Sequence, residues 1–168
     1  MTNLNLILKL KHWHLFASLL VASILGAFFD FSEPAGRIAN DLGFLSLMIW
    51  FIVVSISLKQ KIGPKSTVLF IWSLFCALTS IAGRVALHWM CNLDELFLLF
   101  EDKFLRYSIG VLAIFLFFNL TIFPAKALRT LENGDNVTLD EMLGDIVRLM
   151  FWPLGIWSIQ PRLNKLAP

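Results

Sequence analysis

The sequence predicts an all-α, polytopic membrane protein in which four transmembrane helices form a bundle, with amphipathic interfacial helices beside it. Hydrophobic residues make up 58% of the 168 residues and charged residues only 15%, a composition too apolar for a soluble domain of this size. Residues 104–123 are almost uninterruptedly apolar. A helix rises about 1.5 Å per residue, so some twenty such residues cross the roughly 30 Å hydrocarbon core of a bilayer. We therefore expect one membrane domain over residues 1–168.

Similar apolar stretches recur along the chain, and each has a recognisable boundary. The second stretch is followed by a loop that holds Lys59, Lys61 and Lys65. The last stretch precedes Pro124, and proline disfavours helical geometry at the residue before it. No convincing cleavage site follows the first stretch, so we expect a retained helix rather than a secretory signal. The expected spans are residues 15–31, 42–58, 66–89 and 104–123.

Small residues at spacings of four favour close approach of neighbouring helices in a membrane. Ser18, Ala22 and Gly26 form such a stripe in the first span. Thr79 and Gly83 offer the same spacing in the third span. These stripes predict helix packing within a bundle.

Two amphipathic segments lie outside the spans. Residues 91–104 alternate apolar and acidic positions with helical spacing, as an interfacial helix would. Further on, Thr138 and Glu141 form a capping-box pattern that starts a second helix. We expect this helix to lie on the bilayer or against the bundle, within an amphipathic tail at 138–165. Its apolar stripe comprises Leu139, Met142, Leu143, Ile146, Val147 and Met150.

The distribution of basic residues predicts the topology. Two Lys residues precede the first span and three occupy the loop 59–65, whereas the third connection is acidic overall. The positive-inside rule therefore places both termini in the cytoplasm. The net charge of +2 is too small to indicate nucleic-acid binding. The expected partners are the phospholipid bilayer and a membrane protein, or a second copy of this chain.

Three polar residues are candidate functional or packing groups. Arg84 follows eighteen uncharged residues, so it needs water or a partner. Either it contacts an anion or substrate from outside, together with Asp30, or it has a structural role, in which it reaches the interface or pairs with an acid in the outer loops; we favour the structural role. Asn119 lies in the fourth span, where hydrogen bonding between helices is the ordinary role of an amide.

The residue pattern indicates neither catalysis nor metal or cofactor binding. His12 and His14 are two residues apart, so on a helix they diverge, and His88 belongs to the opposite side of the predicted membrane. No phosphate-binding glycine loop, nucleophile elbow or HExxH sequence is present. We expect no catalytic site, no metal and no cofactor, and Cys76 and Cys91 as free thiols.

The C-terminal run FWPLGIWSIQPRLNK is the most motif-like part of the chain. Proline can begin a short helix and another can end it, glycine permits close approach, and tryptophan favours interfacial depth. We expect a membrane-surface anchor, with a docking site for a protein partner as the alternative. The candidate residues are Trp152, Pro153, Gly155, Trp157, Gln160, Pro161 and Arg162.

This run, together with LKLKHWHLF at residues 8–16, resembles the ends of an uncharacterised group of small four-helix membrane proteins from Bacteroidota. Members of that group carry KHWQLF-like and GIWFIQPRIN-like segments. His14 stands here in place of glutamine and Ser158 in place of phenylalanine. The resemblance covers about two dozen residues and implies a shared architecture and the bacterial inner membrane. It implies no activity.

The function that these observations favour is non-enzymatic. Packing stripes and a surface-active tail suit a structural, regulatory or partner-binding membrane subunit. A small oligomeric transporter or channel is the alternative, since four helices could line a polar path only if several chains assemble. A membrane enzyme acting on lipid is the third hypothesis.

Overall fold

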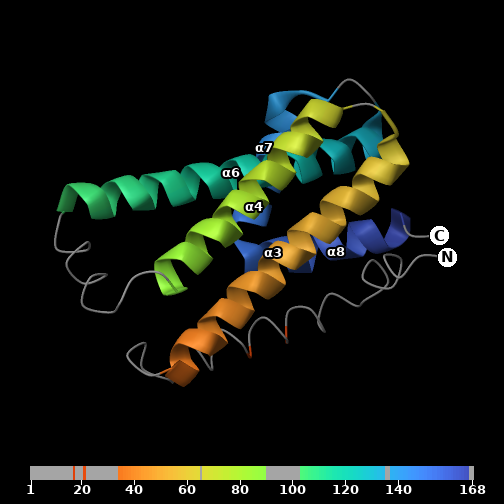
Figure 1. Ribbon diagram of the computed structural model, residues 1–168. Coiled ribbons are helices and arrows are strands. Elements are labelled where there is room, and N and C mark those ends of the chain that lie inside the picture. The colour runs from red at the N-terminus through yellow and green to blue at the C-terminus, as the bar shows by residue number, and fades with distance from the viewer. Residues whose placement is uncertain are drawn as a thin grey trace.

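The computed structural model describes residues 34–64, 66–89, 103–134 and 137–166, and two helical positions at 17 and 21. Every element in these ranges is an α-helix, as expected. The expected first span at 15–31, with Asp30, and the amphipathic segment up to residue 102 lie outside the described residues, apart from those two positions. The helices shown in Figure 1 are α3 (Pro34–Ile62), α4 (Thr67–Trp89), α6 (Lys103–Asn133), α7 (Leu139–Met150) and α8 (Trp152–Leu166).

Three of these helices, α3, α4 and α6, are long and apolar enough to cross a membrane. They coincide with the expected spans that begin at 42, 66 and 104, so the all-helical prediction is confirmed for the described part of the chain, and three of the expected spans have helices of suitable length and apolarity. Helices α7 and α8 pass the same length and composition test only together, and their axes are bent by 118°. By length and composition alone, the pair fits a broken span or a re-entrant loop.

Helix α3 is longer than the predicted span because it begins at Pro34. Proline is favoured in the first turn of a helix, where its missing N–H would have no partner anyway. The helix ends at a left-handed glycine, Gly63, whose φ is 73° and whose N–H donates to the carbonyl of Lys59 at 3.0 Å. The Lys59 ammonium also donates to the Thr67 hydroxyl at 2.6 Å, which ties the end of α3 to the start of α4.

The prediction that the last span ends at Pro124 is wrong, because α6 continues through this residue to Asn133. Proline cannot donate to the carbonyl four residues earlier, which here belongs to Leu120. The Ser73 hydroxyl on α4 donates to that carbonyl at 3.1 Å instead. A neighbouring helix thus replaces the missing donor, as membrane helices commonly allow.

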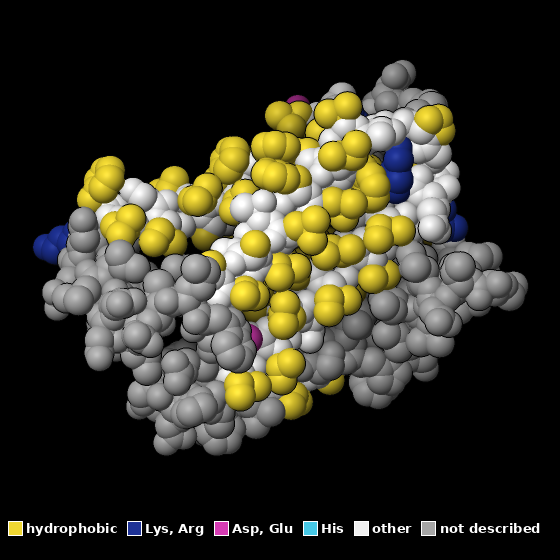
Figure 2. Space-filling model, in the orientation of Figure 1, with side chains coloured by type: hydrophobic (Ala, Val, Ile, Leu, Met, Phe, Trp, Pro, Cys, Tyr) yellow, Lys and Arg dark blue, Asp and Glu magenta, His cyan; other side chains and the backbone are white. Residues whose placement is uncertain are grey.

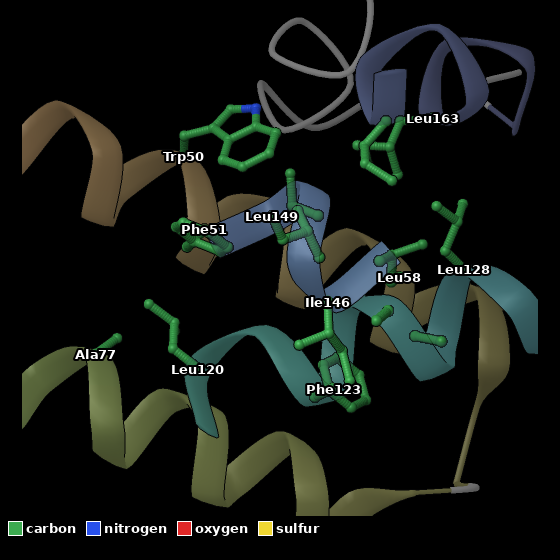
Figure 3. Close-up of a cluster of buried hydrophobic side chains, with 14 of the residues drawn as sticks. Trp50, Phe51, Leu58, Ala77, Leu120, Phe123, Leu128, Ile146, Leu149 and Leu163 are labelled. Atoms are coloured by element: carbon green, nitrogen blue, oxygen red, sulfur yellow. The ribbon is translucent and has the colours of Figure 1, made fainter. Parts of the chain in front are cut away.

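The three long helices pack against one another, and α7 joins them through α6. Phe70 lies edge-on to Phe123 with ring centroids 5.3 Å apart. Three residues later on α4, Ser73 contacts Leu120, which comes three residues before Phe123 on α6. The two helices therefore run antiparallel. The buried apolar cluster in Figure 3 joins α3, α4, α6, α7 and α8. Its labelled members are Trp50, Phe51, Leu58, Ala77, Leu120, Phe123, Leu128, Ile146, Leu149 and Leu163.

The outward faces of the long helices are apolar, as Figure 2 shows for α3 and α4. Figure 1 shows the far ends of α4 and α6 separated, and the first half of α6 is exposed on most sides. Such surface would cause aggregation in water but suits lipid. Gly83 in the predicted small-residue stripe is also exposed, and a Cβ there would meet nothing within 4 Å. The exposed apolar residues of α6 include Phe104, Tyr107, Val111, Leu112, Ile114, Phe115 and Phe118.

Candidate functional site

A buried carboxylate on α7 is the centre of the largest polar cluster among the described residues. Asp145 has 0% exposure, and its two oxygens accept hydrogen bonds from three arginines. Oδ1 accepts from Arg148 Nη1 at 3.2 Å and from Arg162 Nη1 at 2.7 Å. Oδ2 accepts from Arg129 Nε at 2.6 Å and from Arg162 Nη2 at 3.1 Å. One carboxylate therefore connects α6, α7 and α8. We call Asp145, Glu132 and the three arginines Arg129, Arg148 and Arg162 the Asp145 cluster.

Arg162 is the residue that joins the cluster to the end of α6. Its Nε donates to Glu132 Oε1 at 2.7 Å, and its Nη2 pairs with the other oxygen of the same carboxylate. Its remaining donors face Asp145. A guanidinium has a fixed planar fork, so one arginine can hold two carboxylates in a defined geometry. Arg162 thereby fixes α8 against both α6 and α7.

The electrostatic balance of the cluster is positive. Three guanidinium groups face two carboxylates, which leaves one positive charge in excess. Asp145 and Arg129 lie beyond the apolar stretch 104–123. Burial disfavours a charged carboxylate, but the hydrogen bonds that Arg162 and Arg129 donate to Asp145 stabilise its charged form.

Local sequence explains how α7 comes to lie beside the end of α6. Gly134 adopts φ 95°, and its N–H donates to the carbonyl of Thr130 at 3.0 Å, which ends α6. The predicted capping box then starts α7, with the N–H of Thr138 donating to the Glu141 carboxylate at 3.4 Å. This short connection turns the chain back along α6.

Gly155 sets the sharp turn between α7 and α8. A Cβ at this position would lie 2.5 Å from the carbonyl oxygen of Arg148 and 3.0 Å from the Cα of Leu149. Backbone atoms cannot move aside as a flexible side chain can. The predicted role of Gly155 in close approach is therefore confirmed, and the neighbour that approaches is α7 itself.

Gln160 connects α8 to the middle of α3. Its side chain is fully buried, and its Oε1 accepts from the indole N–H of Trp50 at 3.1 Å. Its Nε2 donates to Asn164 Oδ1 at 3.0 Å. Trp50 precedes the end of α3 by twelve residues, or about 18 Å along a helix. Gln160 of α8 therefore meets α3 well before the end of that helix.

The prediction that Pro161 ends the C-terminal helix is wrong, because α8 continues to Leu166. A proline inside a helix loses one backbone hydrogen bond. The contacts of Gln160 and Arg162 on either side, and the burial of Leu163, hold the helix in place despite that loss. Pro153, in contrast, lies in the first turn as predicted.

The C-terminal motif therefore divides into inward and outward residues. Gly155 and Gln160 are buried, and Arg162 is held by the Asp145 cluster, so these three stabilise the fold. Trp157 is exposed and remains a candidate for contact with lipid or a partner. The side chains of Trp152 and Pro153 lie outside the described part of the structure.

Asn119 makes the interhelical contact that the sequence predicts. Its Oδ1 accepts from the indole N–H of Trp72 on α4 at 3.0 Å, and its Nδ2 donates to the carbonyl of Phe115 at 2.8 Å. Both ends of the amide are therefore used within the protein.

Arg84 also pairs with an acid, as expected, but the acid lies on α3 rather than in an outer loop. Its Nε lies 2.8 Å from Asp41 Oδ1, and its guanidinium carbon is 5.9 Å from the centre of the Phe44 ring. The pair is partly exposed. It connects α3 and α4 near the ends opposite to Lys59, and the expected contribution of Asp30 stays a prediction.

Sequence reasoning missed Asp41, Trp50, Glu132 and Asp145 as candidates. Asp145 occurs in the apolar stripe of α7 between Met142 and Leu149, and an acid at a buried helical position was a usable signal. The described residues contain no group of three or more His, Cys, Asp or Glu side chains that could hold a metal ion. Comparison with family models, curated proteins and solved structures finds no match to this chain.

Proposed function

We propose that this chain is a multi-pass protein of the bacterial inner membrane that acts as a structural, regulatory or partner-binding subunit rather than as an enzyme. One observation carries the proposal. The described polar candidates, Arg84, Asn119 and Arg162, each bind a neighbouring helix. Their donors and acceptors serve to arrange helices, and the surface offered outward is apolar.

The proposed topology has four spans, with residues 15–31 as the first and with both termini in the cytoplasm. Lys59 and Lys61 lie at the same end of the bundle as the Asp145 cluster, since α3 ends where α4 begins and α6 ends beside α7. Basic residues gather on the cytoplasmic side of membrane proteins. Helices α7 and α8 would then form a hairpin that enters the bundle from the cytoplasmic side, rather than a tail lying flat on the membrane.

The first half of α6 is the surface we propose for a membrane partner or a second copy of the chain. Val111, Leu112 and Ile114 are all more than half exposed, and Leu112 and Ile114, two residues apart, lie on opposite sides of the helix. A helix with so few neighbours among the described residues is available for helix–helix association in the membrane.

Photo-crosslinking in the native membrane tests this proposal. A photoreactive residue at Val111 or Phe115 should yield one defined protein adduct. The same residue at Val68, an exposed position at the start of α4, should yield none. An adduct of doubled mass identifies a second copy. Equal adducts at Val68 and Val111 would reject this surface, and solute flux through liposomes that contain the purified chain would favour the channel alternative.

A further inference from the structure

Two arginines of the Asp145 cluster keep part of their hydrogen-bonding capacity directed outward. Arg129 uses Nε toward Asp145, and Arg148 uses Nη1. Their side chains remain 26% and 50% exposed. A guanidinium carries five N–H donors, so within the described part of the chain both arginines retain terminal N–H groups for another acceptor.

The shared carboxylate makes these two groups neighbours. Arg129 binds one oxygen of Asp145 and Arg148 binds the other. Both planar groups are therefore oriented before any ligand arrives, which reduces the entropy lost when an anion binds. Arg162 does not contribute in the same way, because Glu132 and Asp145 occupy its donors.

The charge balance favours an anion at this place. The cluster has one positive charge in excess, and Lys126 lies one turn before Arg129 on α6. An uncompensated charge at the edge of a membrane domain is costly unless a counter-charge or water is present. Phosphate oxygens match the guanidinium fork in geometry and charge.

The surroundings indicate the source of that phosphate. Helix α7 carries an exposed apolar stripe on residues four apart, and Arg148 directly follows one of them. An exposed guanidinium beside apolar surface suits the boundary between acyl chains and headgroups, and basic pockets on the cytoplasmic side bind anionic headgroups. The stripe comprises Leu139, Leu143 and Val147, and Phe151 continues it directly after the helix.

We propose that Arg129 and Arg148 bind the phosphate group of an anionic phospholipid, with Asp145 as the residue that orients both guanidinium groups. The site rests on the membrane placement proposed above and is independent of the partner-binding role. Lipid bound there would lie against α6 and α7 and would neutralise the excess charge of the Asp145 cluster.

Lipid titration of the full-length, detergent-solubilised protein by native mass spectrometry tests the proposal. Phosphatidylglycerol should bind saturably and more tightly than phosphatidylcholine. The Arg148→Gln variant should lose about tenfold in affinity for phosphatidylglycerol, the size of one charge-assisted contact. This variant is expected to fold, because Arg129 and Arg162 still pair with Asp145; a thermal unfolding scan checks this.

Two further variants separate a specific site from general surface charge. Lys165→Gln removes the same charge from an exposed position in the last turn of α8, and it should change the affinity by less than about twofold. Arg148→Lys keeps the charge but loses the planar fork, so its affinity should fall between those of the wild type and Arg148→Gln.

Equal losses in Arg148→Gln and Lys165→Gln would overturn the proposal, as would an unchanged affinity in Arg148→Gln. A parallel titration with inorganic phosphate distinguishes the sources. If phosphate raises the melting temperature of the wild type but not of Arg148→Gln, and phosphatidylglycerol shows no preference over phosphatidylcholine, the anion site stands and its ligand is a soluble phosphate. Failure of the crosslinking experiment at Val111 would leave these results unaffected.

Discussion

The hydroxyl of Ser73 on α4 donates to the backbone carbonyl of Leu120 on α6, the carbonyl that Pro124 leaves without its helical partner. Both residues are buried. The contact therefore explains how α6 continues through a proline while remaining packed against α4. The hydrogen bond that the Leu120 carbonyl accepts therefore depends on a single side chain of another helix.

Replacing Ser73 with alanine should destabilise the folded protein by about 1 to 2 kcal/mol, because the Leu120 carbonyl would be left unsatisfied. The measurement is the free energy of unfolding in detergent. Pro124→Ala supplies a helical N–H, so the cost of Ser73→Ala should shrink in that background. The matched control is Ser80→Ala, because the Ser80 hydroxyl donates to the carbonyl of Cys76 in its own helix. An equal cost in both backgrounds would contradict the compensation.

Replacing Gly155 with alanine should cost several kcal/mol or prevent folding, since the new Cβ would overlap the Arg148 carbonyl oxygen. Gly144→Ala is the matched control. Gly144 lies in α7, where an added Cβ would meet nothing within 4 Å, and alanine should stabilise the helix there by up to about 1 kcal/mol. In detergent, the melting temperature of Gly155→Ala should therefore fall and that of Gly144→Ala should rise. A rise in both variants would argue against the tight turn.

Replacing Asp145 with asparagine should destabilise the protein by about 3 to 5 kcal/mol, because three arginines would lose their common carboxylate. The control is Asp140→Asn, an exposed acid in the first turn of α7, whose loss should cost no more than about 1 kcal/mol. Protease resistance of the C-terminal region gives a second readout. Comparable stability of the two variants would show that the Asp145 cluster is not a structural centre.

The topology predicts which ends of α3 can be labelled from outside. In a background without native cysteines, Ile38→Cys should react with a membrane-impermeant maleimide in spheroplasts, and Lys61→Cys should react only after permeabilisation. Both positions are exposed and lie near opposite ends of α3, so the pair controls for reactivity. Labelling of Lys61→Cys in sealed spheroplasts would reverse the proposed orientation.

Individual residues show which helix boundaries the sequence pattern predicts correctly and which it does not. Apolar length predicted α3, α4 and α6, and the capping box at Thr138 predicted the start of α7, because these signals are local. The rule for proline failed at Pro124 and at Pro161. In each case tertiary contacts outweighed a local preference, and a local rule contains no information on them.

The sequence by itself determined the all-helical class of the described residues and the apolar length of the three long helices, because both are local properties of the chain. It also determined the roles of Asn119 and Gly155 in packing. Only the tertiary structure decided which partners these residues meet, and it alone revealed that Arg162 faces two carboxylates. The reason is physical: a buried ion pair depends on three helices meeting at one point, and no spacing along one helix encodes that meeting.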